Sequence, residues 1–137
     1  MGTRRTARES ALKMLYQWDL NREDIGEVSC AYWEMHPAGP EVRAFAGRLV
    51  LATVENKARI DGLIQKHALH WRLERMETLD RNLLRLATAE LLLAGPTPAS
   101  VVIDEAIEIA RRYSTAESPE FVNGLLDSIR KDLQADS

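Results

Sequence analysis

The chain has 137 residues, which suits one domain with a single core, and 45% of them are hydrophobic. Its net charge of -3 taken alone does not point to nucleic acid. The single cysteine, Cys30, excludes an internal disulfide and a cysteine-based metal cluster. No stretch is apolar over a membrane-spanning length, and no apolar signal segment follows the N-terminal arginines, so a cytoplasmic location is the default expectation.

The charges are unevenly placed. The first 13 residues contain four basic residues against one acidic residue, and the rest of the chain is acidic. Such an asymmetry points to an anionic partner. A charged, solvated start of a helix explains the same pattern and is favoured on charge alone.

Residues 3–20 are predicted to form the first helix, with a buried face that recurs at helical spacing. The opposite arc mixes charged residues with Leu12, Tyr16 and Leu20. Two interpretations stay open for this arc. A neighbouring loop covers Leu12 and Tyr16, or the strip is a partner surface with an arginine-rich end.

Weaker periodicity predicts a short helix within 23–36, and strong periodicity predicts helices from residue 41 and on to about 69. The polar residues 55–57 mark either a turn or a continuous helix. His67 and His70 lie three apart, which is a weak metal signal. We expect instead a partly buried His67 and a surface His70.

Residues 78–94 are predicted to form a central helix, because apolar residues cover well over half of its circumference. Only the strip of Arg81, Arg85 and Thr88 is expected to face water. Two more amphipathic helices follow, and the last opens at Ser118-Pro119. No segment alternates like a half-buried strand, so the fold class is all-α with about seven helices.

No pattern of residues converges on a reaction. The chain lacks both glycine-rich phosphate-binding patterns, and Asp104 and Glu105 lie on different sides of a helix. Glu90 falls inside the apolar arc of the central helix, where a structural salt bridge or a contact with a helix end is expected. We therefore predict a helical binding module, not an enzyme, with no metal and no cofactor.

Four segments together resemble the bacterial transcription antitermination factor NusB family. They are RRTARESALKMLYQWDL (4–20), LDRNLLRLATAELL (79–92), VIDEAIEIARRY (102–113) and SPEFVNGLLDSI (118–129). The same domain also begins some ribosomal-RNA cytosine methyltransferases. Because the chain ends before a methyltransferase domain, the free-standing factor is favoured.

The resemblance implies one NusB-like RNA-binding domain over residues 1–137, built as an all-helical bundle of two packed subdomains. It implies binding of single-stranded boxA RNA jointly with NusE, a small-subunit ribosomal protein. The pair then joins RNA polymerase and other Nus factors, and promotes processive transcription of ribosomal RNA operons.

Specific residues follow from the same resemblance. Arg4, Arg5 and Arg8 match the arginine-rich start that would contact RNA phosphates, and Glu117 and Phe121 would lie along the RNA path. The partner surface would use Tyr16 and Asp80, with Arg85 nearby. Two positions depart from the family: Asp80 stands where Glu is common, and Glu117 stands where Asp is common. Each departure changes the length of the acidic side chain by one methylene group.

Two other readings remain. Leu12, Tyr16 and Leu20 suit a protein-binding helical adaptor or a homodimer. An RNA-binding domain associated with a ribosomal-RNA methyltransferase would need that enzyme as a separate subunit.

Overall fold

The computed structural model describes residues 2–93 and 95–135, and every regular element in these ranges is helical. The elements in chain order are α1 (Thr3–Asn21), α2 (Ile25–Met35), α3 (Pro40–Glu55), α4 (Lys57–His67), the 3-10 turn η1 (Leu73–Arg75), α5 (Thr78–Leu93), α6 (Ala99–Tyr113) and α7 (Ser118–Ala135). The predicted all-α class is confirmed. Ala94, the predicted last residue of the central helix, lies outside the described residues.

Helix α5 is the centre of the packing, as its composition predicted. It contacts α1 and α3 on one side, and α4, α6 and α7 on the other. Its apolar residues Leu83, Leu84 and Leu86 are buried in the core that all of these helices share. A helix surrounded in this way must be apolar over most of its circumference.

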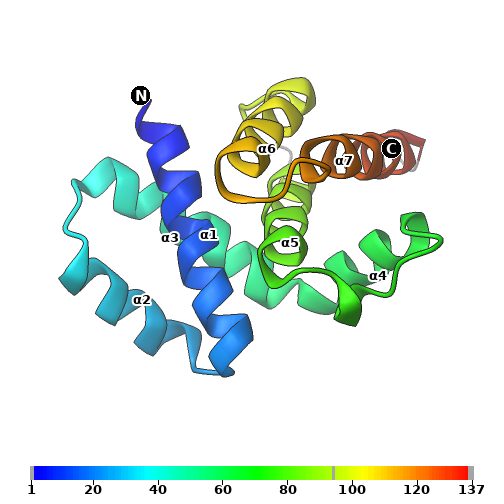
Figure 1. Cartoon of the computed structure of the whole chain (residues 1–137). Helices are drawn as coiled ribbons and strands as arrows, with labels where there is room; N and C mark the ends of the chain where they lie inside the picture. The colour runs from blue at the N-terminus through cyan, green and yellow to red at the C-terminus, as the bar shows by residue number, and fades with distance from the viewer. Residues whose placement is uncertain (1, 94, 136–137) are drawn as a thin grey trace.

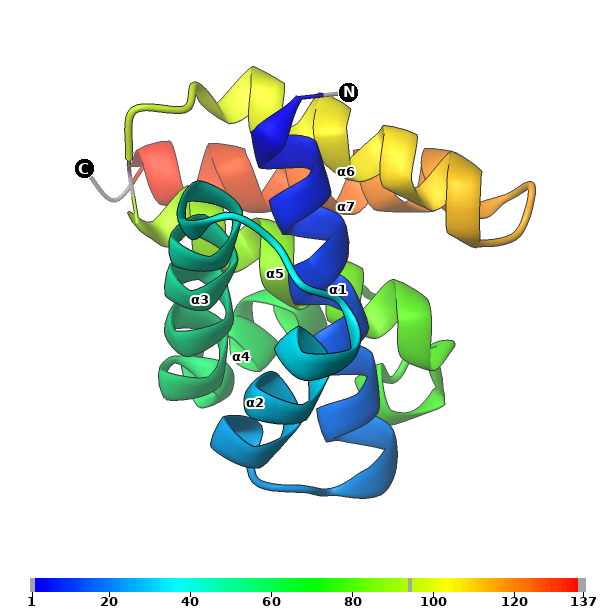
Figure 2. The ribbon, with the colours of Figure 1, turned by 90° about the vertical axis from the view of Figure 1, so that its left-hand side faces the viewer.

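The helices form two packed groups that meet at α5, which confirms the expected arrangement. Helices α2 and α3 pack against α1, and helices α4 to α7 pack among themselves (Figure 1). In the side view the first turns of α1 lie beside α3 and α6 (Figure 2). The start of α1 is therefore a place where both groups come together.

The structure shows how the helix breaks at residues 55–57 and where the two histidines lie. Asn56 separates α3 from α4 as a single turn residue, and its side-chain Nδ2 donates to the carbonyl oxygen of Ala52 at 2.8 Å. His70 is exposed, whereas His67 is partly buried and its Nε2 lies 2.7 Å from Oδ2 of Asp132. His67 thus helps to join α4 to α7, as a structural residue.

The predicted wet edge of α5 is only partly correct. Arg81 is partly exposed, but Arg85 and Thr88 are buried. Arg85 is tolerated there because its guanidinium meets carboxylates from other helices, Asp19 of α1 and Asp61 of α4. Helical periodicity identified these residues as polar, but it could not show which distant acids would enclose them.

Candidate nucleic-acid and partner interface

The guanidinium of Arg8 lies inside the molecule. Its Nε and Nη2 atoms donate hydrogen bonds to the two carboxylate oxygens of Glu90, at 2.8 Å and 2.6 Å. Only 5% of Arg8 is exposed. The guanidinium is therefore enclosed and paired inside the molecule, and the RNA contact expected for Arg8 stays a prediction. The salt bridge expected for Glu90 is confirmed, and it links α1 to α5.

Arg5 is paired too, but it remains partly accessible. Its Nε and Nη2 atoms donate to the Glu105 carboxylate at 2.9 Å and 2.5 Å, and 35% of the side chain is exposed. The hydrogen bond and the charge of Glu105 raise the pKa of Arg5, and the hydrogen bond from Arg5 lowers the pKa of Glu105. A phosphate at Arg5 would have to share this guanidinium with Glu105.

Arg4 is the exposed member of the three predicted arginines. Its Nη1 atom donates to the hydroxyl of Thr97 at 3.2 Å, and its guanidinium lies over the ring of Phe45, 5.4 Å from the centroid. These contacts hold Arg4 against α3 and the segment just before α6. The RNA contacts expected for Arg4 and Arg5 stay predictions.

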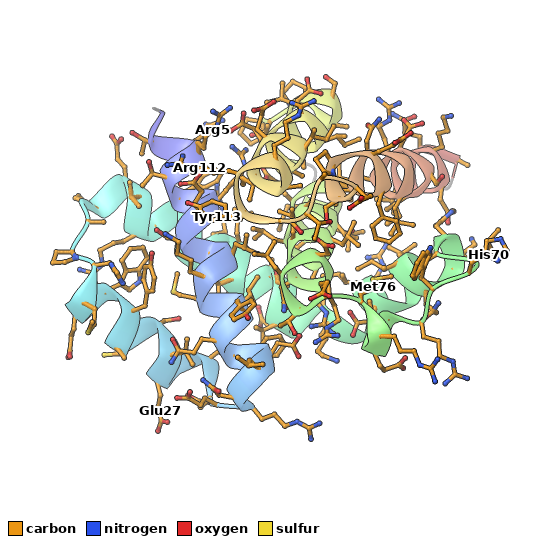
Figure 3. All side chains as sticks on the ribbon, viewed as in Figure 1. Arg5, Glu27, His70, Met76, Arg112 and Tyr113 are labelled. Carbon is orange, nitrogen blue, oxygen red and sulfur yellow. The ribbon has the colours of Figure 1, made fainter. Side chains whose placement is uncertain are left out.

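Two basic side chains flank Tyr113 at the end of α6. Lys13 Nζ and Arg112 Cζ each lie 5.6 Å from the centroid of the Tyr113 ring. Arg112 also pairs with Glu9 of α1 at 3.2 Å. Arg5, Arg112 and Tyr113 follow one another along the side of α1 (Figure 3). The place of Arg112 beside α1 depends on the tertiary fold, because its partner Glu9 lies 103 residues earlier in the chain.

An aromatic cavity lies at the head of α7. The rings of Trp71 and Phe121 meet edge to face, with centroids 6.1 Å apart and an interplanar angle of 72°. Trp71 is 59% exposed. The cavity holds about 250 Å³ and is lined by Trp71, Arg75, Met76, Glu77, Asp80, Thr115, Glu117, Ser118 and Phe121. It brings the predicted Glu117 and Phe121 together.

Trp71 and Arg75 also line this cavity, but neither was among the predicted site residues. A tryptophan followed by arginines at 72 and 75, outside any periodic segment, was the available signal for a binding role. The partner ring of Phe121 is 50 residues further along, so its proximity was not readable from local spacing.

Asp80 forms part of the wall of the cavity and is not an exposed acid. The hydroxyl of Ser114 donates to its Oδ1 at 2.6 Å, and the hydroxyl of Ser118 donates to its Oδ2 at 2.9 Å. Asp80 is only 8% exposed. Both carboxylate oxygens of Asp80 therefore hold the loop between α6 and α7, and its expected place on the partner surface stays a prediction.

Arg85 is likewise internal, and its expected place on the partner surface stays a prediction. Its Nε and Nη2 atoms donate to the Asp61 carboxylate at 2.7 Å and 3.1 Å, and its Nη1 atom donates to Asp19 at 3.1 Å. Only 4% of the residue is exposed. This pairing joins α5 to α1 and α4 and leaves little of Arg85 for another protein.

Tyr16 keeps the surface position that the resemblance implied. It is 38% exposed and borders an almost wholly apolar groove of about 210 Å³, lined by Glu9, Leu12, Lys13, Tyr16, Leu79 and Tyr113. Leu12 is buried and lines the groove from below, and Tyr16 is not covered. Leu20, further along α1, is exposed.

The groove and the cavity are neighbours. Leu79 lines the groove and the next residue, Asp80, lines the cavity. On the other side, Tyr113 lines the groove, and Thr115, two residues later, lines the cavity. One surface therefore carries, in order, the Tyr16 groove, the flanked Tyr113 ring, and the Trp71–Phe121 cavity.

Within residues 2–93 and 95–135, no three or more His, Cys, Asp or Glu side chains gather as metal ligands would. In the same part of the chain, no helix combines the length and apolarity that crossing a membrane requires.

Comparisons with known proteins agree on one family. A sequence model described as the NusB family matches residues 5–131. The transcription antitermination protein NusB of Koribacter versatilis is 47% identical over 136 residues, covering 98% of this chain and 93% of that protein. A solved T. maritima NusB superposes with a TM-score of 0.86 at 41% identity, covering 94% of this chain and 91% of that one.

A second solved structure contains the antitermination factors NusB and NusE in complex with dsRNA. A chain of that structure is 31% identical to this one and superposes with a TM-score of 0.87. The match covers 96% of this chain and 98% of that chain. The similarity therefore extends over nearly the full length of both molecules.

Proposed function

Because the chain belongs to the NusB family, we propose that it is a transcription antitermination factor that binds boxA-like single-stranded RNA together with NusE. The complex joins RNA polymerase and other Nus factors and promotes processive transcription of ribosomal RNA operons. The protein acts by binding, not by catalysis, and it works in the cytoplasm, where the transcript is made.

The observation that carries this proposal is the Trp71–Phe121 cavity. Single-stranded RNA is held by aromatic side chains under unstacked bases and by cations on phosphates. The two rings supply an exposed aromatic edge, and Arg75 lines the same cavity. Glu117, at the head of α7, places an acceptor for base amino groups along the same path.

The partner occupies the adjoining groove. Tyr16, Leu79 and Tyr113 give this groove an apolar lining with little charge, which suits a protein surface better than a nucleic acid. A partner seated there lies beside the cavity, because Leu79 and Asp80 are consecutive. NusE bound in the groove therefore lengthens the surface along which the RNA runs.

RNA binding by this chain alone is weak. Arg5 and Arg8 use their guanidiniums in internal ion pairs, so few cations at the start of α1 remain for phosphates. Each phosphate contact adds a salt-dependent increment of affinity, and few contacts give low affinity. The partner supplies the missing contacts or preorganises the RNA.

The test is a fluorescence anisotropy titration with a boxA-like RNA, a scrambled RNA, and the boxA-like strand annealed to its complement. Each RNA is titrated with the chain alone and with an equimolar mixture of the chain and NusE. The expected result is tight binding only of the boxA-like single strand and only with NusE present. Equal affinity for the scrambled strand, or no gain from NusE, would reject the proposal.

Sedimentation of the chain at several concentrations, with and without RNA, separates this function from a homodimer or an adaptor. A homodimer that forms through the Tyr16 groove would dissociate when NusE is added. Co-purification with a methyltransferase subunit would favour the RNA-modification reading instead.

A further inference from the structure

A second basic surface lies between the start of α1 and the first half of α3. A hollow of about 420 Å³ is lined there by Thr3, Arg4, Glu41, Ala44, Phe45 and Arg48. Residues 41, 44, 45 and 48 share one face of α3 because they are three or four positions apart. We call this hollow the α3 patch. Its contacts involve α1, α3 and the start of α6, and none involves the Trp71–Phe121 cavity.

Three guanidiniums gather around one ring in the α3 patch. The Cζ atoms of Arg4, Arg8 and Arg48 lie 5.4 Å, 5.3 Å and 5.3 Å from the centroid of Phe45. Each contact is a favourable cation–π interaction. The three positive charges nevertheless repel one another, so their grouping is favoured only where negative charge compensates them.

The compensation inside the molecule is incomplete. Glu90 neutralises Arg8. Arg4 and Arg48 are exposed and form no ion pair with any carboxylate in the described part of the chain. Glu41 also lines the hollow, but it lies in no ion pair within those residues and is exposed. Two fixed, accessible guanidiniums therefore remain for an external anion.

We propose that Arg4 and Arg48 bind the phosphate backbone of the transcript, on nucleotides outside the segment held at the Trp71–Phe121 cavity. This inference rests on the proposed function. The flanking nucleotides lie along the start of α1 and the adjoining face of α3. The first turns of α1 form this edge of the molecule (Figure 2). Since the contacts are to phosphates, they are independent of base sequence.

The experiment compares three RNAs with the protein and NusE together. The first contains only the boxA-like element, and the others extend it by an unstructured flank on the 5′ side or on the 3′ side. A flank on one side should raise the affinity several-fold. It should also steepen the dependence of log affinity on log salt by roughly 0.7 for each added phosphate contact.

Three variants of α3 give the matched comparison. Arg48→Gln should remove the gain from the flank and leave the affinity for the short RNA unchanged. Glu41→Gln should enlarge the gain, because it removes a negative charge beside Arg4 and Arg48. Arg43→Gln is the control. Arg43 is exposed on the same helix and lies over Trp33 at 5.8 Å, but it is not in the hollow.

The outcomes separate this inference from the proposed function. If the short RNA binds with NusE but neither flank raises the affinity, the α3 patch is not an RNA site. The same holds if Arg48→Gln and Arg43→Gln reduce the gain equally, since the effect would then be one of general charge. Failure of the short RNA to bind would reject both proposals. Thermal melting of each variant shows that the fold is kept.

Discussion

The Arg8 guanidinium and the Glu90 carboxylate form a buried pair with two hydrogen bonds, which fastens the start of α1 to the second half of α5. Arg5 makes the same kind of contact with Glu105 of α6. An arginine-rich helix start thus serves internal assembly first. Phosphate binding at this end of the molecule therefore depends on arginines that form no internal ion pair among the residues that the structure describes, such as Arg4.

Replacing Arg8 should destabilise the protein more than it affects RNA contacts. Arg8→Ala leaves the Glu90 carboxylate buried without a partner, which costs about 3–5 kcal/mol of unfolding free energy. Urea denaturation at neutral pH measures this loss. The double variant Arg8→Met/Glu90→Leu should recover much of it, because no unpaired charge remains.

Arg4→Ala is the matched control for Arg8, because Arg4 is exposed and should change stability by less than about 0.5 kcal/mol. A fully stable Arg8→Ala variant with weakened RNA binding would contradict the internal role of Arg8. It would restore the phosphate contact that the sequence suggested.

Helical periodicity was sufficient to predict most of the fold. The apolar stripes of α1, α3, α6 and α7 and the nearly all-round apolar surface of α5 follow from spacing alone. Spacing alone did not predict which polar residues are buried or what they contact. Arg8, Arg85 and Asp80 looked like surface residues because their partners, Glu90, Asp61 and the two serines 114 and 118, lie 24 to 82 residues away.

Only some residues of the candidate site were predicted, for the same reason. Phe121 and Glu117 were named through the resemblance, and they do line one cavity. Trp71 was missed because its ring meets Phe121, 50 residues further along the chain, only in the folded protein. Pairings between distant segments require the tertiary structure.

Stability should fall in acid through Asp19. Burial alone would raise the pKa of Asp19, but hydrogen bonds from Asn82 and Arg81 and the charge of Arg85 outweigh it and lower the pKa. A carboxyl with a lowered folded-state pKa stabilises the protein above its unfolded pKa of about 3.9. This contribution is lost as the pH falls through the folded pKa. Glu105, whose pKa the Arg5 hydrogen bond lowers, acts in the same direction.

Asp19→Asn should therefore lower the urea midpoint at pH 7 and reduce the further loss between about pH 5 and pH 2. Glu34→Gln is the control, since Glu34 is exposed and has no ion pair within the described residues. Parallel pH profiles for the native protein and Asp19→Asn would show that this carboxylate does not contribute.

Asp80 should control the loop between α6 and α7. Asp80→Ala removes the acceptor of the Ser114 and Ser118 hydroxyls, which costs about 1–3 kcal/mol and loosens residues 114–118. Hydrogen–deuterium exchange of this segment should become faster, whereas Asp104→Ala, an exposed acid of α6, should leave it unchanged. If NusE affinity falls without any change in exchange, Asp80 faces the partner, as the family resemblance implied.

Tyr16 should carry a large part of the partner affinity. It borders the apolar groove, and tyrosines in such positions are often energetic centres of protein interfaces. Tyr16→Ala should weaken NusE binding roughly tenfold, a loss of about 1.4 kcal/mol. Leu20→Ala is the control, because Leu20 is exposed on the same helix and does not line the groove. Equal losses from both variants in a pull-down titration would place the partner elsewhere.

Trp71 should contribute to RNA binding by stacking, and its effect should be separable from that of charge. A base stacked on an aromatic ring is worth about 1–3 kcal/mol, so Trp71→Ala should weaken the RNA complex roughly tenfold or more. Its salt dependence should stay unchanged because no charge is removed. Trp71→Phe should restore part of the affinity. Arg75→Gln, in the same cavity, should instead flatten the salt dependence by roughly 0.7 if Arg75 contacts a phosphate.

Leu69→Ala is the control for Trp71, since Leu69 is highly exposed, lies two residues earlier, and does not line the cavity. Anisotropy titrations with the boxA-like RNA and NusE at three salt concentrations measure both quantities at once. Unchanged affinity for Trp71→Ala would show that the base does not meet this ring, and a flattened salt dependence would show that the variant disturbs the neighbouring cations. Unchanged affinity would remove Trp71 from the RNA path and leave Phe121 as the aromatic contact to test in that cavity.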